Sequence, residues 1–185
     1  MSEVTTKPVI ASVWLAGCSG CHMSLLDIDE RLLAVLEKAD IAATPVTDFK
    51  LGGFPKCTVG LVEGSVTNSD NVKFLLELRE KSDVLVSLGD CAGWGCVPFM
   101  RNFFPLTEVM EHGYIWSSST VDGHIPDDPE LPQFLETVQP IRKYVKVDYH
   151  IPGCPPSADT IFYVINELLE GREPTAIPQP LLHFD

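Results

Sequence analysis

The sequence has few basic residues. Its 185 residues include 13 Lys and Arg against 26 Asp and Glu, so the formal net charge is −13, and no cluster of adjacent basic residues is longer than two. Binding to nucleic acid or to an anionic membrane surface needs a concentration of positive charge. The composition therefore disfavours nucleic acid and membranes as partners of this chain.

The sequence also has no long hydrophobic run. Residues 8–26 contain no Asp, Glu, Lys or Arg, but glycines and cysteines between positions 17 and 21 interrupt the segment. A transmembrane helix needs about 20 predominantly apolar residues. Residues 1–7 show neither a secretory charge pattern nor a pair of arginines. We therefore expect a cytoplasmic protein without a membrane segment.

Six cysteines are present without an export signal. Thiols in the cytoplasm are normally kept reduced, so a disulfide framework is not expected. Apolar residues make up 45% of the chain and charged residues 21%, a composition that can bury a hydrophobic core. We therefore expect one globular domain in which the cysteines serve a metal or redox site.

Runs of β-branched residues alternate with segments of helical periodicity, which predicts strands alternating with helices. This alternation indicates an α/β fold, a flavodoxin-like doubly wound parallel sheet with helices on both faces. We assign residues 1–171 to this domain and residues 172–185 to an extended C-terminal tail. The expected strands are residues 9–15, 41–46, 57–62, 84–88 and 144–149, and the expected helices are residues 23–39, 69–81, 130–139 and 157–170, with an irregular segment at 89–105.

Four of the cysteines follow predicted strands. Cys18 and Cys21 come after the first strand, Cys91 after the strand at 84–88, and Cys154 after the last strand. The carboxyl ends of parallel strands lie at one edge of a sheet, where their loops converge on a common crevice. We therefore expect the four thiols to meet, although they are far apart in the sequence.

Four converging thiolates fit either a tetrahedral zinc ion or an iron–sulfur cluster. Structural zinc usually takes two close cysteine pairs, whereas Cys91 and Cys154 are single residues on separate loops. Cys154 also precedes a proline, as in bacterial cluster motifs. The pattern favours one four-iron, four-sulfur (4Fe-4S) cluster in the 1–171 domain. A thioredoxin-like dithiol at Cys18 and Cys21 would leave Cys91 and Cys154 without a role.

The other candidate residues are open to more than one interpretation. Cys57 begins its strand, at the wrong end for the site, and is interpreted as a small buried hydrophobe. Cys96 could replace Cys91 as a ligand, but a thiol beside the site is the preferred interpretation. His22 could tune a cluster by hydrogen bonding, but a surface or loop position is preferred.

Glu63 ends the third strand and so faces the same crevice. A carboxylate beside a negatively charged cluster is costly, so a proton route, a bond to loop N–H groups or a partner contact would explain it. An ordinary turn residue before Gly64 is an equally supported interpretation. Asp90 is interpreted as a turn former. Trp14 and the Trp and Phe residues of the segment 92–116 are interpreted as mostly core, some of them exposed at an interface.

Four motifs occur in the order Cys18-Ser-Gly-Cys21-His, Glu63-Gly-Ser-Val, Gly89-Asp-Cys91-Ala and Gly153-Cys154-Pro-Pro. In this order they resemble the small subunit of nickel-iron hydrogenases, and the resemblance covers nearly the whole chain. The short length is most similar to that of the cytoplasmic, bidirectional NAD-reducing hydrogenases. Longer family members carry a twin-arginine leader and a second C-terminal domain with two further clusters. We find neither in this sequence and expect a one-cluster subunit.

The resemblance implies that Cys18, Cys21, Cys91 and Cys154 hold the proximal 4Fe-4S cluster, and that the nickel-iron centre belongs to a separate large subunit. It further implies an electron relay. Hydrogen is split in the large subunit, and electrons pass through this cluster to a diaphorase module, with FMN and iron–sulfur clusters, that reduces NAD. The chain would then contain no catalytic residue of its own, and Glu63 stays a candidate proton-route or interface carboxylate.

Two alternatives come from other classes. The related cluster-bearing subunit of respiratory complex I shares the Glu-Gly and Cys-Pro motifs, but it has adjacent cysteines where this chain has Cys18-x-x-Cys21. A free-standing flavodoxin-like carrier or zinc-stabilised binding module is the other alternative. Some relatives of the hydrogenase have been proposed to hold FMN, and the loops Ser19–Gly20 and Ser65–Asn68 lie where a phosphate could bind. FMN is disfavoured because a cluster already occupies the crevice.

Overall fold

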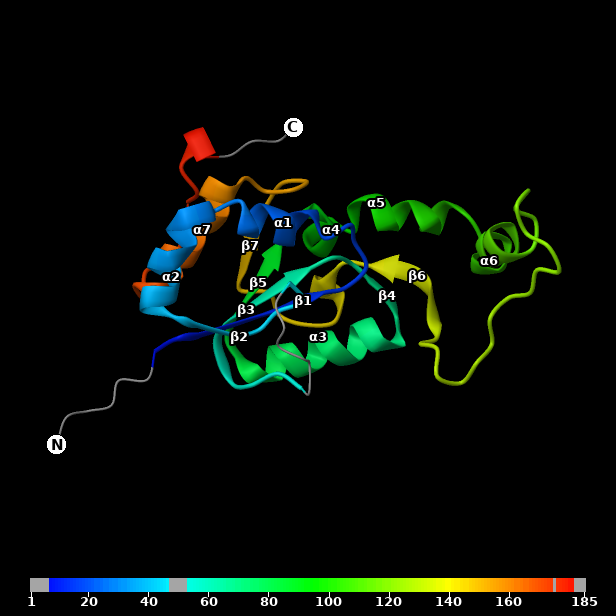
Figure 1. Cartoon of the computed structure of the whole chain (residues 1–185), viewed down its shortest axis with the longest axis horizontal. Coiled ribbons are helices and arrows are strands. Elements are labelled where there is room, and N and C mark those ends of the chain that lie inside the picture. Colours follow the sequence, from blue (N-terminus) through cyan, green and yellow to red (C-terminus); the bar gives the residue numbers. More distant parts are fainter. Residues whose placement is uncertain (1–6, 47–52, 175, 182–185) are drawn as a thin grey trace.

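The computed structural model describes residues 7–46, 53–174 and 176–181. Five parallel strands form its main sheet, in the order β2-β1-β3-β5-β7 (Figure 1). Taken in chain order, they follow the 2-1-3-4-5 arrangement of flavodoxin-like folds, which confirms the predicted α/β class. The strands are β1 (Val9–Trp14), β2 (Asp40–Ala43), β3 (Cys57–Glu63), β5 (Ser82–Leu88) and β7 (Tyr149–Ile151).

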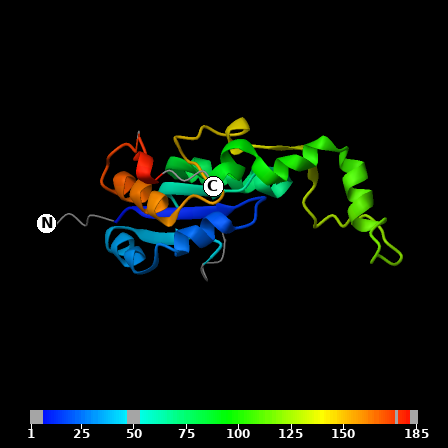
Figure 2. The same cartoon turned by 90° about the horizontal axis from the view of Figure 1, so that it is seen from above.

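Helices cover both faces of this sheet, as predicted (Figure 2). Side chains of β3 alternate between two cores, with Val59 and Leu61 on one face and Val62 on the other, as the period of two requires. The first face is covered by α1 (Gly20–Leu26), α2 (Leu32–Lys38) and α7 (Ala158–Leu169), and the second by α3 (Ser69–Lys81) and the 3-10 helix η3 (Ile141–Lys143).

The sequence supplies the caps that start the two longest helices. The Asn68 side chain accepts a hydrogen bond from the Asn71 N–H at the start of α3, and Ser157 accepts one from the Thr160 N–H at the start of α7. Both side chains satisfy a backbone donor that has no partner inside the helix. The predicted helices at 69–81 and 157–170 are therefore confirmed almost to the residue.

An arm projects from the body of the molecule in both ribbon views (Figures 1 and 2). We define the arm as residues 97–133. It follows α4 (Gly89–Trp94), and no residue of its longest helix is buried. The chain returns through β6 (Phe134–Gln139), which pairs antiparallel with β4 (Val66–Asn68). The arm contains most of α5 (Cys96–Phe99), the 3-10 helix η2 (Met100–Phe103) and α6 (Leu106–Tyr114).

Residues 89–105 were expected to be irregular, and this prediction is wrong because most of the segment is helical. Glycine usually weakens a helix, but in α4 it allows close packing on the sheet. A Cβ atom on Gly93 would lie 2.4 Å from the His150 ring. The glycines that suggested a loop therefore let a helix lie directly against β7.

The predicted helix at 130–139 is also wrong, because residues 134–139 form β6. The apolar spacing is helical, but tertiary contacts determine the backbone. Asn102 hydrogen-bonds both the N–H and the carbonyl of Val138, at 2.7 and 2.9 Å. These bonds and the pairing with β4 satisfy backbone groups that a helix would satisfy internally.

Two other boundaries differ from the prediction. The helix expected at 23–39 begins at Gly20 and is interrupted between α1 and α2, where η1 (Asp29–Arg31) starts with a φ of 55° at Asp29. The last strand is β7, later than the expected 144–149. The tail contains η4 (Gln179–Leu181), and its boundary at residue 171 stays a prediction. Residues 1–6, 175 and 182–185 lie outside the described residues.

Asp148 joins α3, β5 and the approach to β7. Its carboxylate accepts hydrogen bonds from the Leu85 N–H at 2.9 Å and from Arg79 Nη1 at 2.6 Å, and it forms an ion pair with Lys146 at 2.9 Å. Burial alone would raise the pKa of Asp148, but these donors together lower it to about 2.

We predict that Asp148→Ala lowers the free energy of unfolding by about 2 kcal/mol at pH 7, because it removes charge-assisted hydrogen bonds. The folded pKa lies below the unfolded value of about 3.9, so the stabilisation is present above pH 4 and is lost as the pH falls towards 2. Urea unfolding of the variant and the wild type at pH 7 and near pH 2 measures the difference in free energy of unfolding. Asp83→Ala, at an exposed position of β5, is the control, and an equal loss in both variants would contradict the prediction.

Candidate metal centre

The sheet register brings the four predicted ligands to one edge. Trp14, Glu63, Leu88 and Ile151 are successive partners across β1, β3, β5 and β7. Cys18 and Cys21 follow β1, and Cys91 and Cys154 follow β5 and β7 within three residues of the strand ends. The loops therefore leave the sheet side by side, as the parallel arrangement predicted. Cys21 is buried and Cys91 is half-buried, whereas Cys18 and Cys154 are exposed.

The thiols are close enough to affect one another electrostatically. Burial raises the pKa of Cys21, and the charges of Glu63, Cys91, Cys18 and Cys154 raise it further. Burial and the neighbouring Cys96 and Cys154 raise the pKa of Cys91 to about 12. Burial and the neighbouring negative charges therefore disfavour the thiolate forms of Cys21 and Cys91. A site that holds them as thiolates needs concentrated positive charge, which metal ions supply.

Glycines keep the backbone close to these sulfurs. A Cβ on Gly89, which has a φ of 78°, would lie 2.3 Å from Cys21 Sγ, and a Cβ on Gly20 would lie 3.2 Å from Cys18 Sγ. The Val97 N–H donates a hydrogen bond to Cys91 and lowers its pKa. N–H groups directed at sulfur are a recognised way to stabilise an iron–sulfur cluster. The residues present therefore fit such a cluster.

Glu63 is buried beneath this cluster of thiols. Its carboxylate accepts hydrogen bonds from the backbone N–H groups of Cys21 at 3.2 Å and His22 at 2.9 Å. It also pairs with His22 Nδ1, while His22 Nε2 lies 3.0 Å from Ser12 Oγ. The arrangement matches a His22 that donates from Nδ1 to Glu63 and accepts from the Ser12 hydroxyl. Every polar atom of this buried set has a partner.

His22 was expected on the surface or in a loop, and this prediction is wrong. Its side chain is fully buried in the first turn of α1. A histidine next to a cysteine motif gives no sign of burial. Ser12 was not predicted as a site residue, because a serine in a strand carries no signal that it faces a histidine ten residues later.

Asp90 connects two of the cysteine loops. Its backbone N–H donates to the Gly153 carbonyl at 3.0 Å, and the Gly153 N–H donates to its carboxylate at 2.9 Å. Each partner is directly adjacent to a candidate ligand, Cys91 or Cys154. Asp90 is thus more than a turn former, because it fixes the spacing of these two loops.

The remaining cysteines occupy different environments. Cys57 is buried at the start of β3, hydrogen-bonded to Ser82 Oγ at 3.3 Å, so the prediction of a small buried residue is confirmed. Cys96 lies beside the site and hydrogen-bonds both Cys91 and Cys154. This is the position expected of a neighbouring thiol.

The large aromatic residues were expected to be mostly core, and this part of the prediction is wrong. Trp94 is 55% exposed and Phe103 is 78% exposed. The alternative expectation, that the segment 92–116 exposes aromatic side chains, agrees with the structure. The other residues of the set are also exposed, namely Trp14, Phe99, Phe104 and Trp116.

Ser65 holds α4 in place, a role that the sequence did not indicate. Its hydroxyl lies 2.8 Å from the Cys91 carbonyl oxygen and 3.0 Å from that of Gly95.

In residues 7–46, 53–174 and 176–181, no group of three His, Cys, Asp or Glu side chains is arranged to bind a single metal ion. Across the same ranges, every helix is too short or too polar to span a bilayer.

Comparison with known proteins identifies the family. A family model described as NADH ubiquinone oxidoreductase, 20 Kd subunit, matches residues 18–168. The chain belongs to this family. Within it, the delta subunit of the NAD-reducing hydrogenase HoxS of Cupriavidus necator is 42% identical over 183 residues, which cover 97% of this chain and 86% of that protein. The predicted resemblance to NiFe hydrogenase small subunits is therefore confirmed.

Other relatives and proteins of the same fold differ in length. A subunit of the F420-non-reducing hydrogenase of Methanothermobacter marburgensis is 41% identical, and the match covers 90% of this chain but 55% of that protein. A crystal structure of an NAD+-reducing NiFe hydrogenase contains a chain with 42% identity and a TM-score of 0.92, covering 97% of this chain and 99% of that one. A NiFeSe hydrogenase from Dm. baculatum shares the fold, with 18% identity and a TM-score of 0.56, over 98% of this chain and 68% of that one.

We predict that Cys154→Ala abolishes retention of bound iron, because it removes one of the four thiolate ligands that the cluster needs. Iron and acid-labile sulfide, measured after anaerobic purification, test this outcome. Cys57→Ala is the matched control, with full iron content and a loss of stability of about 1 kcal/mol from the small cavity. Full iron content in Cys154→Ala would contradict the ligand assignment.

Proposed function

We propose that this chain is the electron-transfer small subunit of a cytoplasmic NAD-reducing nickel-iron hydrogenase. It relays electrons between the nickel-iron site of a large subunit and a diaphorase module through one proximal 4Fe-4S cluster. The observation that carries the proposal is the meeting of four strand-end cysteines in a chain 42% identical, over nearly its whole length, to a subunit of an NAD-reducing hydrogenase.

Cys18, Cys21, Cys91 and Cys154 would hold the cluster. When bound by four thiolates, a 4Fe-4S cluster supplies one-electron transfer, and its potential depends on hydrogen bonds to sulfur and on solvent exposure. The chain controls both properties through the close glycine backbone and the burial of Cys21. In this proposal the large subunit carries the hydrogen-activating nickel-iron site, and this chain carries the cluster.

Glu63 and Asp90 position the ligands. The Glu63 carboxylate accepts hydrogen bonds from the backbone N–H groups of Cys21 and His22 and so stabilises the fold of the cysteine motif. Of the explanations for a carboxylate at this position, binding of loop N–H groups is therefore favoured over an ordinary turn residue. Asp90 fixes Gly153 and therefore the distance between Cys91 and Cys154.

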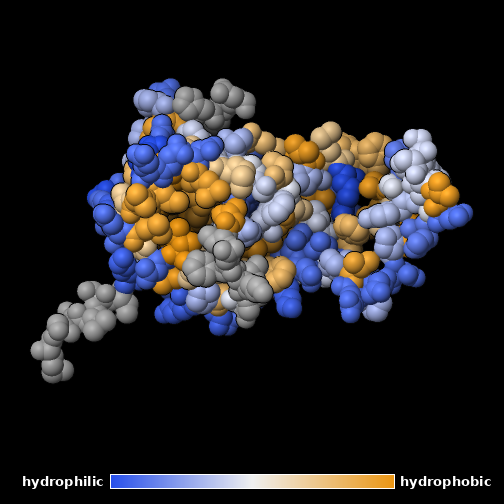
Figure 3. Space-filling view, in the orientation of Figure 1, coloured by the Kyte–Doolittle hydropathy of each residue, from blue (hydrophilic) through white to orange (hydrophobic). Residues whose placement is uncertain are grey.

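The arm is suited to contact partner subunits. It carries many large hydrophobic side chains that are exposed in the isolated chain, and Figure 3 shows apolar side chains along its upper edge. Exposed apolar surface of this extent is typical of protein interfaces. We assign it to subunit contact in the hydrogenase. The exposed residues include Val97, Met100, Phe103, Phe104, Ile115, Trp116 and Val121.

FMN bound to this chain is the weaker alternative. Ser65 is fully buried with its hydroxyl bonded to backbone carbonyls, and Asn68 caps α3. The polar side chains at the two ends of the Ser65–Asn68 loop therefore serve the fold. In our proposal the flavin belongs to the diaphorase module.

Anaerobic purification through an affinity tag on this chain tests the proposed function. We predict about four irons per chain, a nickel-bearing large subunit and a flavoprotein in the same preparation. The measurement combines metal and sulfide analysis with identification of the co-purified chains. Zinc in an isolated, colourless chain would instead establish the binding-module alternative.

We predict that Glu63→Gln impairs hydrogen-driven NAD reduction severalfold while iron content stays close to that of the wild type. Glutamine keeps one acceptor for the two N–H groups but removes the charge that pairs with His22. Activity and iron are measured on the same complex. Glu37→Gln, at an exposed carboxylate, is the control. Activity equal to that of the control would show that the charge of Glu63 has no part in turnover.

A further inference from the structure

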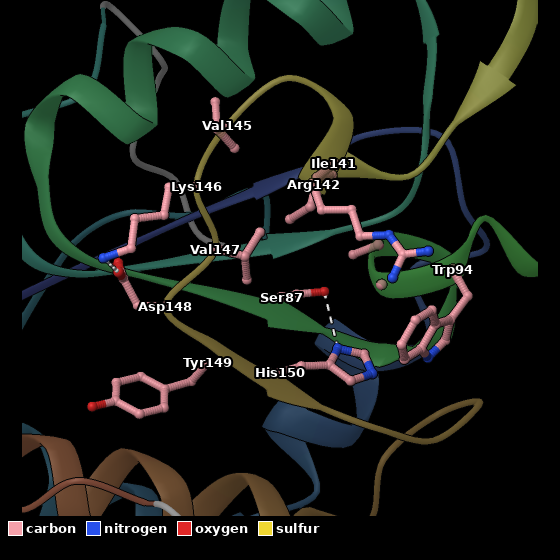
Figure 4. Close-up of a pocket in the computed structure, with 12 residues that line it drawn as sticks. Ser87, Trp94, Ile141, Arg142, Val145, Lys146, Val147, Asp148, Tyr149 and His150 are labelled. Carbon is pink, nitrogen blue, oxygen red and sulfur yellow. Dashed lines mark hydrogen bonds and ion pairs between the residues drawn. The ribbon is translucent and has the colours of Figure 1, made fainter.

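A pocket of about 360 Å³ lies between α4 and the segment that leads into β7 (Figure 4). Its walls are largely apolar, with Ala92 and Gly93 from α4 and Ile141, Val145 and Val147 from the opposite side. It lies at the outer edge of the sheet, since β7, which contributes Tyr149 and His150 to its lining, is an edge strand. The candidate metal centre does not use this pocket.

Three side chains stack at one end of the pocket. The Arg142 guanidinium lies over the Trp94 ring, 4.5 Å from its centroid, and the Trp94 and His150 rings meet edge to face at 5.4 Å. His150 Nδ1 lies 3.1 Å from Ser87 Oγ, and its buried Nε2 has no hydrogen-bond partner. Figure 4 shows these residues on adjacent elements. Exposed tryptophan and arginine are the residue types that most often dominate binding energy at protein interfaces.

The rim of the pocket is positively charged in a strongly acidic protein. Residues 142–146 contain three basic residues and no acidic one, whereas the whole chain has a net charge of −13. The nearest carboxylates are already engaged, since Asp148 pairs with Arg79 and Lys146, and Asp90 binds the Gly153 N–H. Arg142 is exposed and forms no ion pair with any described residue. Lys146 is therefore compensated by Asp148, whereas Arg142 and its neighbour Lys143 offer uncompensated positive charge.

The position of the pocket suits electron transfer. Trp94 follows Cys91 by three residues on α4, about one helical turn. The exposed candidate ligands Cys18 and Cys154 lie on other loops, after β1 and β7. Neither cysteine lines the pocket, so a partner bound there and a partner bound at the exposed thiols would contact different residues.

We propose that this pocket is the docking surface for the diaphorase module and that it receives an acidic segment carrying one apolar side chain. The apolar side chain fills the pocket, and the acidic groups pair with Arg142 and Lys143. This inference rests on the proposed function and deepens it by naming the surface that faces the electron acceptor. Charge complementarity of this kind sets the rate and specificity of association.

Charge reversal in the tagged, full complex tests the inference. In Arg142→Glu, the flavin-to-nickel ratio of the purified complex falls about tenfold at low salt, and the difference from the wild type narrows at raised salt, because salt screens the charges. Lys143→Glu, at an exposed position, gives a smaller loss in the same direction, and Arg142→Lys restores the ratio in part. Lys56→Glu, an equal charge change directly before β3, is the control and keeps the wild-type ratio.

The outcomes separate this inference from the proposed function. Retention of flavin in both charge-reversal variants, at all salt concentrations, would overturn the docking surface. Loss of nickel with retention of flavin would also overturn it, because the pocket would then face the large subunit. A wild-type preparation without any flavoprotein would instead overturn the proposed function itself.

Discussion

Parallel pairing of β1, β3, β5 and β7 is the constraint on which the site depends. At the carboxyl edge of the sheet, one row of paired residues crosses these four strands, namely Trp14, Glu63, Leu88 and Ile151. Every candidate ligand lies within seven residues beyond this row. A shift of one strand by one residue would turn its side chains to the other face and separate the thiols. The core on both faces of the sheet therefore also fixes the relative positions of the candidate ligands.

Burial of charge next to this edge is the second condition. Glu63 and His22 are almost completely buried, which is costly unless each polar atom has a partner. The Cys21 and His22 N–H groups and Ser12 supply those partners, so the same bonds that compensate for burial also shape the cysteine motif. The N–H groups of Cys21 and His22 therefore have two roles: they compensate for the burial of the Glu63 carboxylate, and their bonds to it fix the backbone of the cysteine motif.

The sequence predicted the parts of the fold that depend on local pattern. Strand-end cysteines could be predicted to converge because parallel topology alone determines where strand ends lie. The capped helix at Ser69–Lys81 could be predicted because Asn68 supplies a local signal. By contrast, β6 could not be predicted, since its conformation depends on Asn102 and β4, which are distant in the sequence. The burial of His22 depends on Glu63 in the same way.

The exposed aromatic side chains have a related explanation. Large apolar residues are usually buried, so Trp94 and Phe103 were assigned to the core. Their exposure in the single chain fits burial against other subunits. The sequence pattern of one chain does not distinguish a residue of the core from a residue of a subunit interface. The structure therefore predicts contact with other subunits more directly than the sequence does, because it shows an arm whose longest helix has no buried residue (Figure 1).

Anomalous X-ray scattering from crystals of the anaerobically purified complex tests the central claim most directly. The account predicts iron, and no zinc, in the space bounded by the Sγ atoms of Cys18, Cys21, Cys91 and Cys154. A zinc signal at this position would contradict it. Iron bound by Cys96 in place of Cys91 would contradict the ligand set.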